Sequence, residues 1–142
     1  MAQVSTYLNF PRQTEEAFNY YKSVFGTELM GQGFMRFKDT PACDEMGLAE
    51  EDKNLIMHVA LPILGGHVIM GTDSPESMNF KINFGNNVYI CLSPDTREET
   101  RRLFKALSEG GKELQDMFWG DYFGSCKDKF GVQWMFNCSA KE

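Results

Sequence analysis

The sequence predicts an α+β fold made of two modules, each running strand, helix and then three strands. One observation is a repeated helical pattern, because the apolar spacing of residues 17–24 recurs at 100–107. The other is that a strand-like run precedes each helix, at 4–10 and at 87–93. Self-similarity of this kind indicates an internal duplication. We therefore expect one domain over 1–142, with a first βαβββ module at 1–73 and a second at 80–142.

The first helix is predicted by apolar residues at positions i, i+3, i+4 and i+7. They are preceded by Thr14, which is a good N-cap residue. Glu15 and Glu16 favour the positive end of the helix dipole. Gly26 is expected to end the helix, since glycine tolerates the left-handed conformation found there.

The second helix carries a clear start signal. Thr96 and Glu99 have the T-x-x-E spacing of a capping box. Gly110 and Gly111 are predicted to end this helix. Only three residues then separate Gly111 from Gln115, so the arm that follows is either shortened or lacks part of a loop.

The strands of the first module are expected at 29–37 and 55–61, with a polar loop at 38–54 between them. Gly31 and Gly33 suggest a bulge or strong curvature in the earlier strand. The later strand alternates, with Leu55, Met57, Val59 and Leu61 on one face and Ile56, His58 and Ala60 on the other.

Glycine-containing turns complete each module. Gly65-Gly66 predicts a hairpin into 67–70, with His67 as an exposed turn residue. The matching run at 131–135 follows Asp128–Gly131, where Asp caps the turn and Gly supplies a positive φ. Residues 73–79 are predicted to link the modules.

Composition excludes several classes of protein. The chain has 142 residues, with 14 basic and 20 acidic side chains and a net charge of −6, which argues against nucleic-acid binding through phosphate neutralisation. We find neither a leader-like N-terminus nor an apolar run that could span a bilayer, so we expect a cytoplasmic protein without membrane partners. Cys43, Cys91, Cys126 and Cys138 lack metal-ligand spacing and are predicted to be free, mostly buried thiols.

Six stretches that span nearly the whole chain carry a resemblance to a known family. They resemble the PhnB-like group, also labelled 3-demethylubiquinone methyltransferase-like, of the vicinal oxygen chelate superfamily. That superfamily includes glyoxalase I, bleomycin-resistance proteins and extradiol dioxygenases. The matching stretches are Tyr7–Phe10, Ala17–Lys22, Ile56–Val59, Ile69–Asp73, Gln115–Gly120 and Asp128–Met135.

The resemblance implies two mixed sheets that curl around a shared cleft holding a metal or a ligand, in a protein that forms a homodimer. It also implies metal ligands, as His, Gln or Glu, on the first and last strands of each module. Strand endings map those positions to Met70 and Met135, to Thr6, and to Val88 or Tyr89. These residues are poor ligands for a hard cation, so we expect no metal and no other cofactor.

Seven residues are predicted to bind a ligand, and none is assigned a catalytic role. His58 could polarise a ligand or transfer a proton, or it could be a structural histidine bonded to a backbone carbonyl. The run with Gln115, Asp116, Phe118, Trp119 and Tyr122 is expected to form one strand that lines a pocket. Ordinary sheet packing with a dimer contact explains the same run equally well. The predicted ligand-binding residues are His58, Tyr89, Gln115, Asp116, Phe118, Trp119 and Trp134.

We expect the protein to bind a small apolar or aromatic molecule in a metal-free cleft. One alternative is a divalent-metal-dependent lyase, isomerase or dioxygenase, for which His58, Asp116 and Asp121 are the reserve donors. Another is a dimeric partner protein whose cleft is vestigial. A methyltransferase of the doubly wound type is disfavoured, because the chain is short and has no glycine-rich nucleotide loop.

Overall fold

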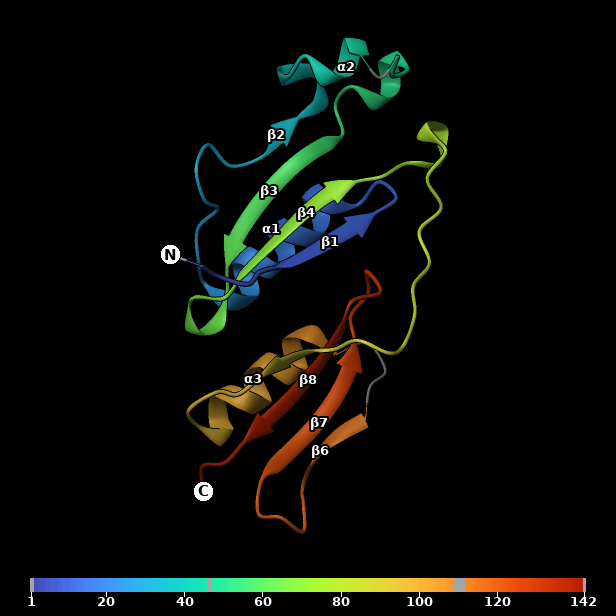
Figure 1. The fold of residues 1–142 in the computed structure, drawn as a ribbon. Helices are drawn as coiled ribbons and strands as arrows, with labels where there is room; N and C mark the ends of the chain where they lie inside the picture. Colours follow the sequence, from blue (N-terminus) through green and yellow to red (C-terminus); the bar gives the residue numbers. More distant parts are fainter. Residues whose placement is uncertain (1, 46, 109–111, 142) are drawn as a thin grey trace. The chain divides into compact units, whose positions relative to one another are not determined.

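The computed structural model describes residues 2–45, 47–108 and 112–141 (Figure 1). The chain forms two compact units, Met1–Ile82 and Asn83–Glu142. Each unit contains one long helix and one mixed sheet of four strands. The predicted α+β fold with two βαβββ modules is therefore confirmed. No helix in the described ranges is long and apolar enough to cross a membrane.

The first unit has the strand order β1-β4-β3-β2. Strand β1 runs parallel to β4, and the other neighbours are antiparallel. Short helical turns occupy the connections: η1, α2 and η2 between β2 and β3, η3 between β3 and β4, and η4 after β4. The elements are β1 (Thr6–Phe10), α1 (Thr14–Phe25), β2 (Met35–Arg36), η1 (Phe37–Asp39), α2 (Ala42–Glu45), η2 (Glu50–Asp52), β3 (Ile56–Pro62), η3 (Leu64–Gly66), β4 (Val68–Asp73) and η4 (Glu76–Met78).

Helix α1 packs on one face of this sheet, against β3 and β4 (Figure 1). Ala17, Tyr21 and Val24 are buried at the predicted spacing, but Phe18 is buried where Tyr20 was expected, and Tyr20 is half-buried. Every second residue of the strands faces these side chains. Gly71 is required at the centre, because a Cβ atom there would lie 2.5 Å from Cε1 of Phe18. The core comprises Phe10, Ala17, Phe18, Tyr21, Val24, Val59, Leu61 and Ile69.

The N-terminus of α1 is capped from the sheet. Gln13, not Thr14, is the N-cap residue, and it makes no side-chain cap. Instead the backbone N–H and Oγ1 of Thr14 donate to Oδ1 of Asp73, over 3.0 and 2.8 Å. The backbone N–H of Ile56 donates to Oδ2 over 2.9 Å. The buried Asp73 carboxylate thus joins α1, β3 and β4, and the prediction of Thr14 as the cap was wrong.

The strand predicted at 29–37 is reduced to β2, Met35–Arg36. Gly31 and Gly33 adopt positive φ angles of 59° and 82°, and the N–H of Gly33 donates to the carbonyl of Met30 in a turn. These turn conformations prevent continuous pairing with β3. At its C-terminal end α1 stops at Gly26 with φ 65°, as predicted.

Strand β3 contains a bulge. Met35 pairs with His58 and Arg36 pairs with Ile56, so the register shifts at Met57. Ile56 is consequently buried with Val59. The prediction that Ile56 shares a face with His58 was therefore wrong, because strict alternation does not continue through a bulge.

The second unit repeats the arrangement with the order β5-β8-β7-β6. Strand β5 is parallel to β8, and the other neighbours are antiparallel. Helix α3 packs on β7 and β8, where Leu103, Leu107, Trp134, Phe136 and Cys138 are buried. The elements are β5 (Ile90–Leu92), α3 (Arg97–Leu107), β6 (Lys112–Asp116), β7 (Tyr122–Lys127) and β8 (Gln133–Cys138).

Helix α3 begins with its own cap. Thr96 accepts a hydrogen bond from the N–H of Glu99, as the capping box predicts. The Glu99 side chain, however, binds Arg102 rather than returning to the N-cap residue. The helix ends at Leu107, before the two glycines expected to end it. Gly110 and Gly111, including the Gly111 end of the short arm, lie outside the described residues.

The turn between β7 and β8 is built on a second buried carboxylate. Asp128 accepts from the backbone N–H groups of Phe130 and Val132, over 2.9 and 3.1 Å. It also accepts from Nε1 of Trp134 over 2.8 Å. The predicted turn at Asp128–Gly131 is confirmed, with φ 92° at Gly131.

Three of the four cysteines belong to the described side chains, and all three are free: Cys91 is exposed, and Cys126 and Cys138 are buried. Burial, with a smaller contribution from the charge of Asp128, raises the pKa of Cys126 to about 12. The fourth, Cys43, has a side chain outside the described part.

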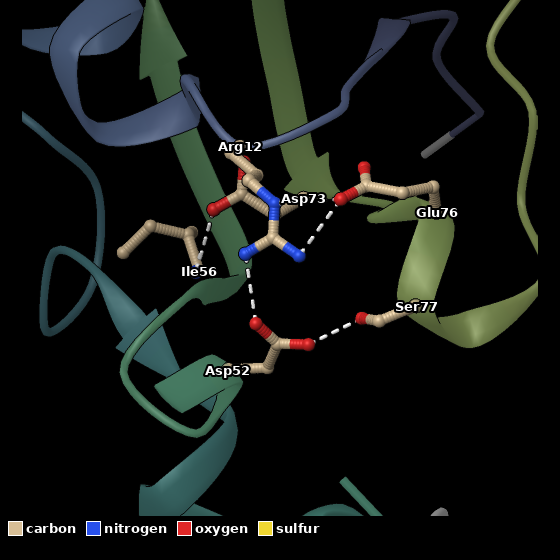
Figure 2. Close-up of polar contacts among 6 residues, drawn as sticks. All are labelled: Arg12, Asp52, Ile56, Asp73, Glu76 and Ser77. Atoms are coloured by element: carbon tan, nitrogen blue, oxygen red, sulfur yellow. Dashed lines mark hydrogen bonds and ion pairs between the residues drawn. The ribbon is translucent and has the colours of Figure 1, made fainter. Parts of the chain in front are cut away.

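An ionic cluster ties the 38–54 loop and the segment after β4 to the end of β1 (Figure 2). Arg12 lies 2.7 Å from Oδ1 of the buried Asp52 and 3.0 Å from Oε1 of Glu76. Ser77 donates to the other oxygen of Asp52. The hydrogen bond from Arg12, followed by that from Ser77, lowers the pKa of Asp52.

Replacement of Asp73 by Ala should destabilise the first unit by about 3 kcal/mol, because three buried donors lose their acceptor. Asp73→Asn should cost less. Its oxygen can still accept from Thr14, but its NH₂ group would face the N–H of Ile56. Both tryptophans, Trp119 and Trp134, lie in the second unit, so we would follow the first unit by hydrogen exchange of α1 amides.

Asp95→Ala is the matched control, since Asp95 is exposed. It should leave α1 exchange unchanged. If Asp73→Ala exchanges no faster than this control, the carboxylate does not hold α1 to the sheet.

The Arg12–Asp52 pair should make stability depend on acidic pH. The pKa of Asp52 is lower in the folded chain than its usual value of about 4. Its contribution is therefore present above about pH 4 and is lost as pH falls through the folded pKa. Arg12→Gln should lower the urea midpoint at pH 6 and should flatten its fall below about pH 4.

Lys38→Gln removes a charge from the same loop at an exposed position and serves as the control. Its midpoint should fall with acid as steeply as that of the unmodified chain. An equally steep fall in Arg12→Gln would contradict the role assigned to this pair.

Candidate functional site

The first sheet has a face that α1 does not cover, and we call it the open face. Its residues alternate along the strands with those that α1 buries. Tyr7 on β1 pairs with Met70 on β4, which also pairs with Ala60 on β3. In the next row Asn9 pairs with Thr72, while Met35 on β2 pairs with His58. The open face consists of Tyr7, Asn9, Met35, His58, Ala60, Pro62, Val68, Met70 and Thr72.

Tyr7 and His58 contact each other on the open face. Oη of Tyr7 lies 3.2 Å from Nδ1 of His58, and the ring centroids are 5.9 Å apart with a tilt of 37°. Tyr7 is 49% exposed, and burial of the remainder raises the pKa of its hydroxyl. A phenol and an imidazole thus stand together where a ligand can reach them.

The alternative prediction was a structural histidine bonded to a backbone carbonyl. His58 instead forms its hydrogen bond with the side chain of Tyr7. It shares the face of Ala60, as the strand pattern predicts. Sequence reasoning missed Tyr7, although Tyr7 and Asn9 alternate with the buried Phe10. The other histidine, His67, is half-buried with Nε2 2.9 Å from Oγ1 of Thr6, so its prediction as an exposed turn residue was wrong.

The run predicted as one strand at 115–122 is in fact a hairpin. Strand β6 ends at Asp116, and β7 begins at Tyr122. Between them the N–H of Met117 donates to the carbonyl of Asp121 over 2.8 Å. Gly120, with φ 100°, allows the chain to reverse.

This hairpin brings some predicted residues together at its tip. Phe118 is 95% exposed, and its ring lies 4.9 Å from that of Trp119. Trp119 is in turn 6.0 Å from Phe123, which pairs with Gln115. Gln115 and Trp119 therefore lie beside Phe123 on the side of the second sheet opposite α3, and Phe118 contacts Trp119.

Asp116 contacts the start of α3 and not the hairpin tip. It lies 2.5 Å from the buried Arg97 at the start of α3. The guanidinium of Arg97 also lies 4.6 Å from the centre of the Tyr122 ring and donates to the carbonyl of Ala140. This cluster fixes the first turn of α3 against the sheet, so Asp116 has a structural partner.

The two remaining predicted residues are separate from the hairpin tip. Trp134 is fully buried on the α3 side of the sheet, bonded to Asp128. Tyr89 directly precedes β5 and is 38% exposed. His58 belongs to the first unit and is described with it.

The register corrects the positions to which the resemblance assigns metal ligands. Met70 pairs with Tyr7, not Thr6, and Met135 pairs with Cys91 rather than Val88 or Tyr89. The side chains at these positions are a phenol, a thiol and two thioethers, which do not fit a hard divalent cation. Among the residues described, no three His, Cys, Asp or Glu side chains gather closely enough to hold a metal ion.

A hollow in the first unit lies beside the Arg12–Asp52 cluster, because Ser77 belongs to both. It measures about 500 Å³, and its wall comes from the 38–54 loop and from η4. The hollow is lined by Gly47, Leu48, Ala49, Ser77, Met78 and Asn79.

Comparisons with known proteins cover nearly the whole chain. The family model for 3-demethylubiquinone-9 3-methyltransferase matches residues 2–136. Protein YjdN of Escherichia coli (strain K12) is 30% identical over 142 residues, covering 94% of this chain and 93% of YjdN. The crystal structure of PA1353 from Pseudomonas aeruginosa is 33% identical, with a TM-score of 0.83 over 99% of this chain and 100% of that one.

Other solved structures extend the likeness. The PhnB protein from Bacillus cereus is 25% identical, with a TM-score of 0.74 over 96% of this chain and 99% of that one. A glyoxalase/bleomycin resistance protein/dioxygenase family enzyme from Burkholderia phytofirmans PsJN shares the fold at 16% identity, with a TM-score of 0.61. The chain therefore belongs to the PhnB-like family described as 3-demethylubiquinone-9 3-methyltransferase, and it shares its fold with proteins of the glyoxalase/bleomycin resistance/dioxygenase superfamily.

Proposed function

We propose that the protein binds a small apolar or aromatic molecule on the open face of its first sheet. The observation that carries this proposal is the composition of that face. Tyr7, Met35 and Met70 supply an aromatic ring and two thioethers, which make adaptable contacts with apolar ligands. His58, Asn9 and Thr72 supply a few polar groups beside them. Apolar walls with a small number of placed polar groups are typical of small-molecule sites.

The second unit supports the same proposal through a matching residue. Met135 occupies on β8 the place that Met70 occupies on β4, since each pairs with the parallel first strand of its unit. Phe123 lies on the same side of β7, beside Trp119. Two sheets of one chain thus present methionine and aromatic side chains on the side away from their helices.

Binding is favoured over divalent-metal chemistry by the donors present. Tyr7, Met70, Cys91 and Met135 offer softer or weaker ligands than the carboxylates and imidazoles such an enzyme would use. The methyl transfer in the family description is not proposed either. Each sheet has a single parallel pair of strands, unlike the doubly wound parallel sheet of nucleotide-binding enzymes.

Self-association and cellular location stay predictions. We propose a homodimer on the family resemblance, and sedimentation of the purified full chain would test it. The cytoplasmic location is proposed from the sequence alone.

Naphthalene is a suitable probe of the proposed site, because it is apolar and planar and carries no polar group. We expect saturable binding that raises the melting temperature; at a hundred times Kd the gain is about 2.7 kcal/mol. Met70→Glu should weaken binding at least tenfold by placing a charge at the centre of the open face.

Met78→Glu is the matched control, since Met78 lines the hollow beside η4. It should bind naphthalene as the unmodified chain does. Loss of binding in Met78→Glu alone would move the site to that hollow and contradict the proposal. The proposal would also be contradicted if the purified protein held one divalent metal ion per chain and lost it in His58→Ala.

A further inference from the structure

His58 has one ring nitrogen in use and one available. Nδ1 faces the Tyr7 hydroxyl at 3.2 Å. Nε2 has no hydrogen-bond partner within residues 2–45, 47–108 and 112–141. Because His58 is only half-buried, a molecule on the open face can reach this nitrogen.

The Tyr7 hydroxyl determines what Nε2 can do. A phenol is a stronger acid than a neutral imidazole N–H, so the favourable arrangement has Oη donating to Nδ1. A neutral imidazole whose Nδ1 accepts must carry its proton on Nε2. Protonation of the ring also leaves a proton on Nε2. In both states Nε2 therefore carries a hydrogen and can donate a hydrogen bond to a ligand.

The surroundings of this donor are uncharged. The other members of the open face are a phenol, an amide, a hydroxyl, an alanine, a proline, a valine and two thioethers. The carboxylate of Asp73, at the end of β4, is committed to Thr14 and Ile56 on the α1 side. A ligand acceptor would meet no competing carboxylate among the open-face residues.

We propose that the Tyr7–His58 pair selects aromatic ligands that carry an oxygen acceptor, a carbonyl or carboxylate oxygen, over hydrocarbons of the same shape. This inference rests on the proposed function. His58 contacts the acceptor through Nε2, while the hydroxyl of Tyr7 has a positioning role and fixes the proton on that nitrogen. The Tyr7 ring and the thioethers of Met35 and Met70 hold the aromatic body of the ligand.

The experiment compares two probes of similar shape, 2-acetylnaphthalene and 2-isopropylnaphthalene, on the full chain. Removal of the donor in His58→Leu should weaken the acetyl compound about fivefold to tenfold, as expected for one hydrogen bond. The isopropyl compound should bind both proteins alike. Using the ratio between proteins cancels the different hydration of the two probes. 2-Naphthoate should show the same dependence on His58, and its affinity relative to the ketone tells carboxylate from carbonyl recognition.

Two further variants separate recognition from a structural role. His58→Gln restores an N–H donor and should recover part of the preference for the acetyl compound. Tyr7→Phe keeps the ring but loses the hydroxyl, so its loss should be confined to the acetyl compound. The ¹⁵N chemical shifts of the His58 ring should report a proton on Nε2 in the unmodified chain and a mixture of tautomers in Tyr7→Phe.

The inference is overturned if His58→Leu weakens both probes equally or neither. It is also overturned if the ¹⁵N shifts place the proton on Nδ1. If naphthalene still binds in these cases and Met70→Glu still weakens its binding, the proposed function is retained. Failure of every naphthalene compound to bind would overturn the proposed function itself.

Discussion

The first unit depends on one buried carboxylate. Asp73 accepts two hydrogen bonds from Thr14 and one from the backbone of Ile56, and it therefore fixes the start of α1 and the start of β3 to the end of β4. Without a side-chain cap of its own, α1 needs this acceptor from the sheet. The position of α1 decides in turn which side chains of the strands are buried. The side chains that α1 does not cover, Tyr7 and His58 among them, form the open face.

The second unit solves the same problem differently. Helix α3 carries its own cap at Thr96, so the end of β8 is free to be apolar, and the buried Cys138 stands there. The buried carboxylate of this unit, Asp128, instead closes the β7–β8 turn and holds the Trp134 indole. A duplicated fold can therefore keep its topology while its polar anchors move, because each buried donor needs an acceptor but the acceptor can come from several elements.

Much of the fold could be predicted from the sequence, because helix spacing, caps and glycine turns are local signals. The bulge at Met57 and the cap from Asp73 could not, since each depends on contacts with residues distant in the chain. The strand predicted at 29–37 failed for a related reason: Gly31 and Gly33 suggested a curved strand, whereas their positive φ angles form turns. For the candidate site, alternation placed His58 correctly. Its partner Tyr7 was missed because β1 and β3 do not pair directly. Both pair with β4, so their proximity is visible only once the strand order is known.

Equivalent backbone positions in the two units hold side chains of different chemistry, so the shared fold does not determine what each sheet can bind. The register places Tyr7 beside Met70 and Cys91 beside Met135, so the same backbone locations hold different chemistry in the two units. Neither pair provides the hard donors a divalent cation prefers. In the first unit the phenol controls the proton of a neighbouring imidazole, whereas Cys91 has no histidine in its unit, because both histidines precede residue 83. In the proposed site, the donor for a ligand acceptor therefore comes from the Tyr7–His58 pair of the first sheet.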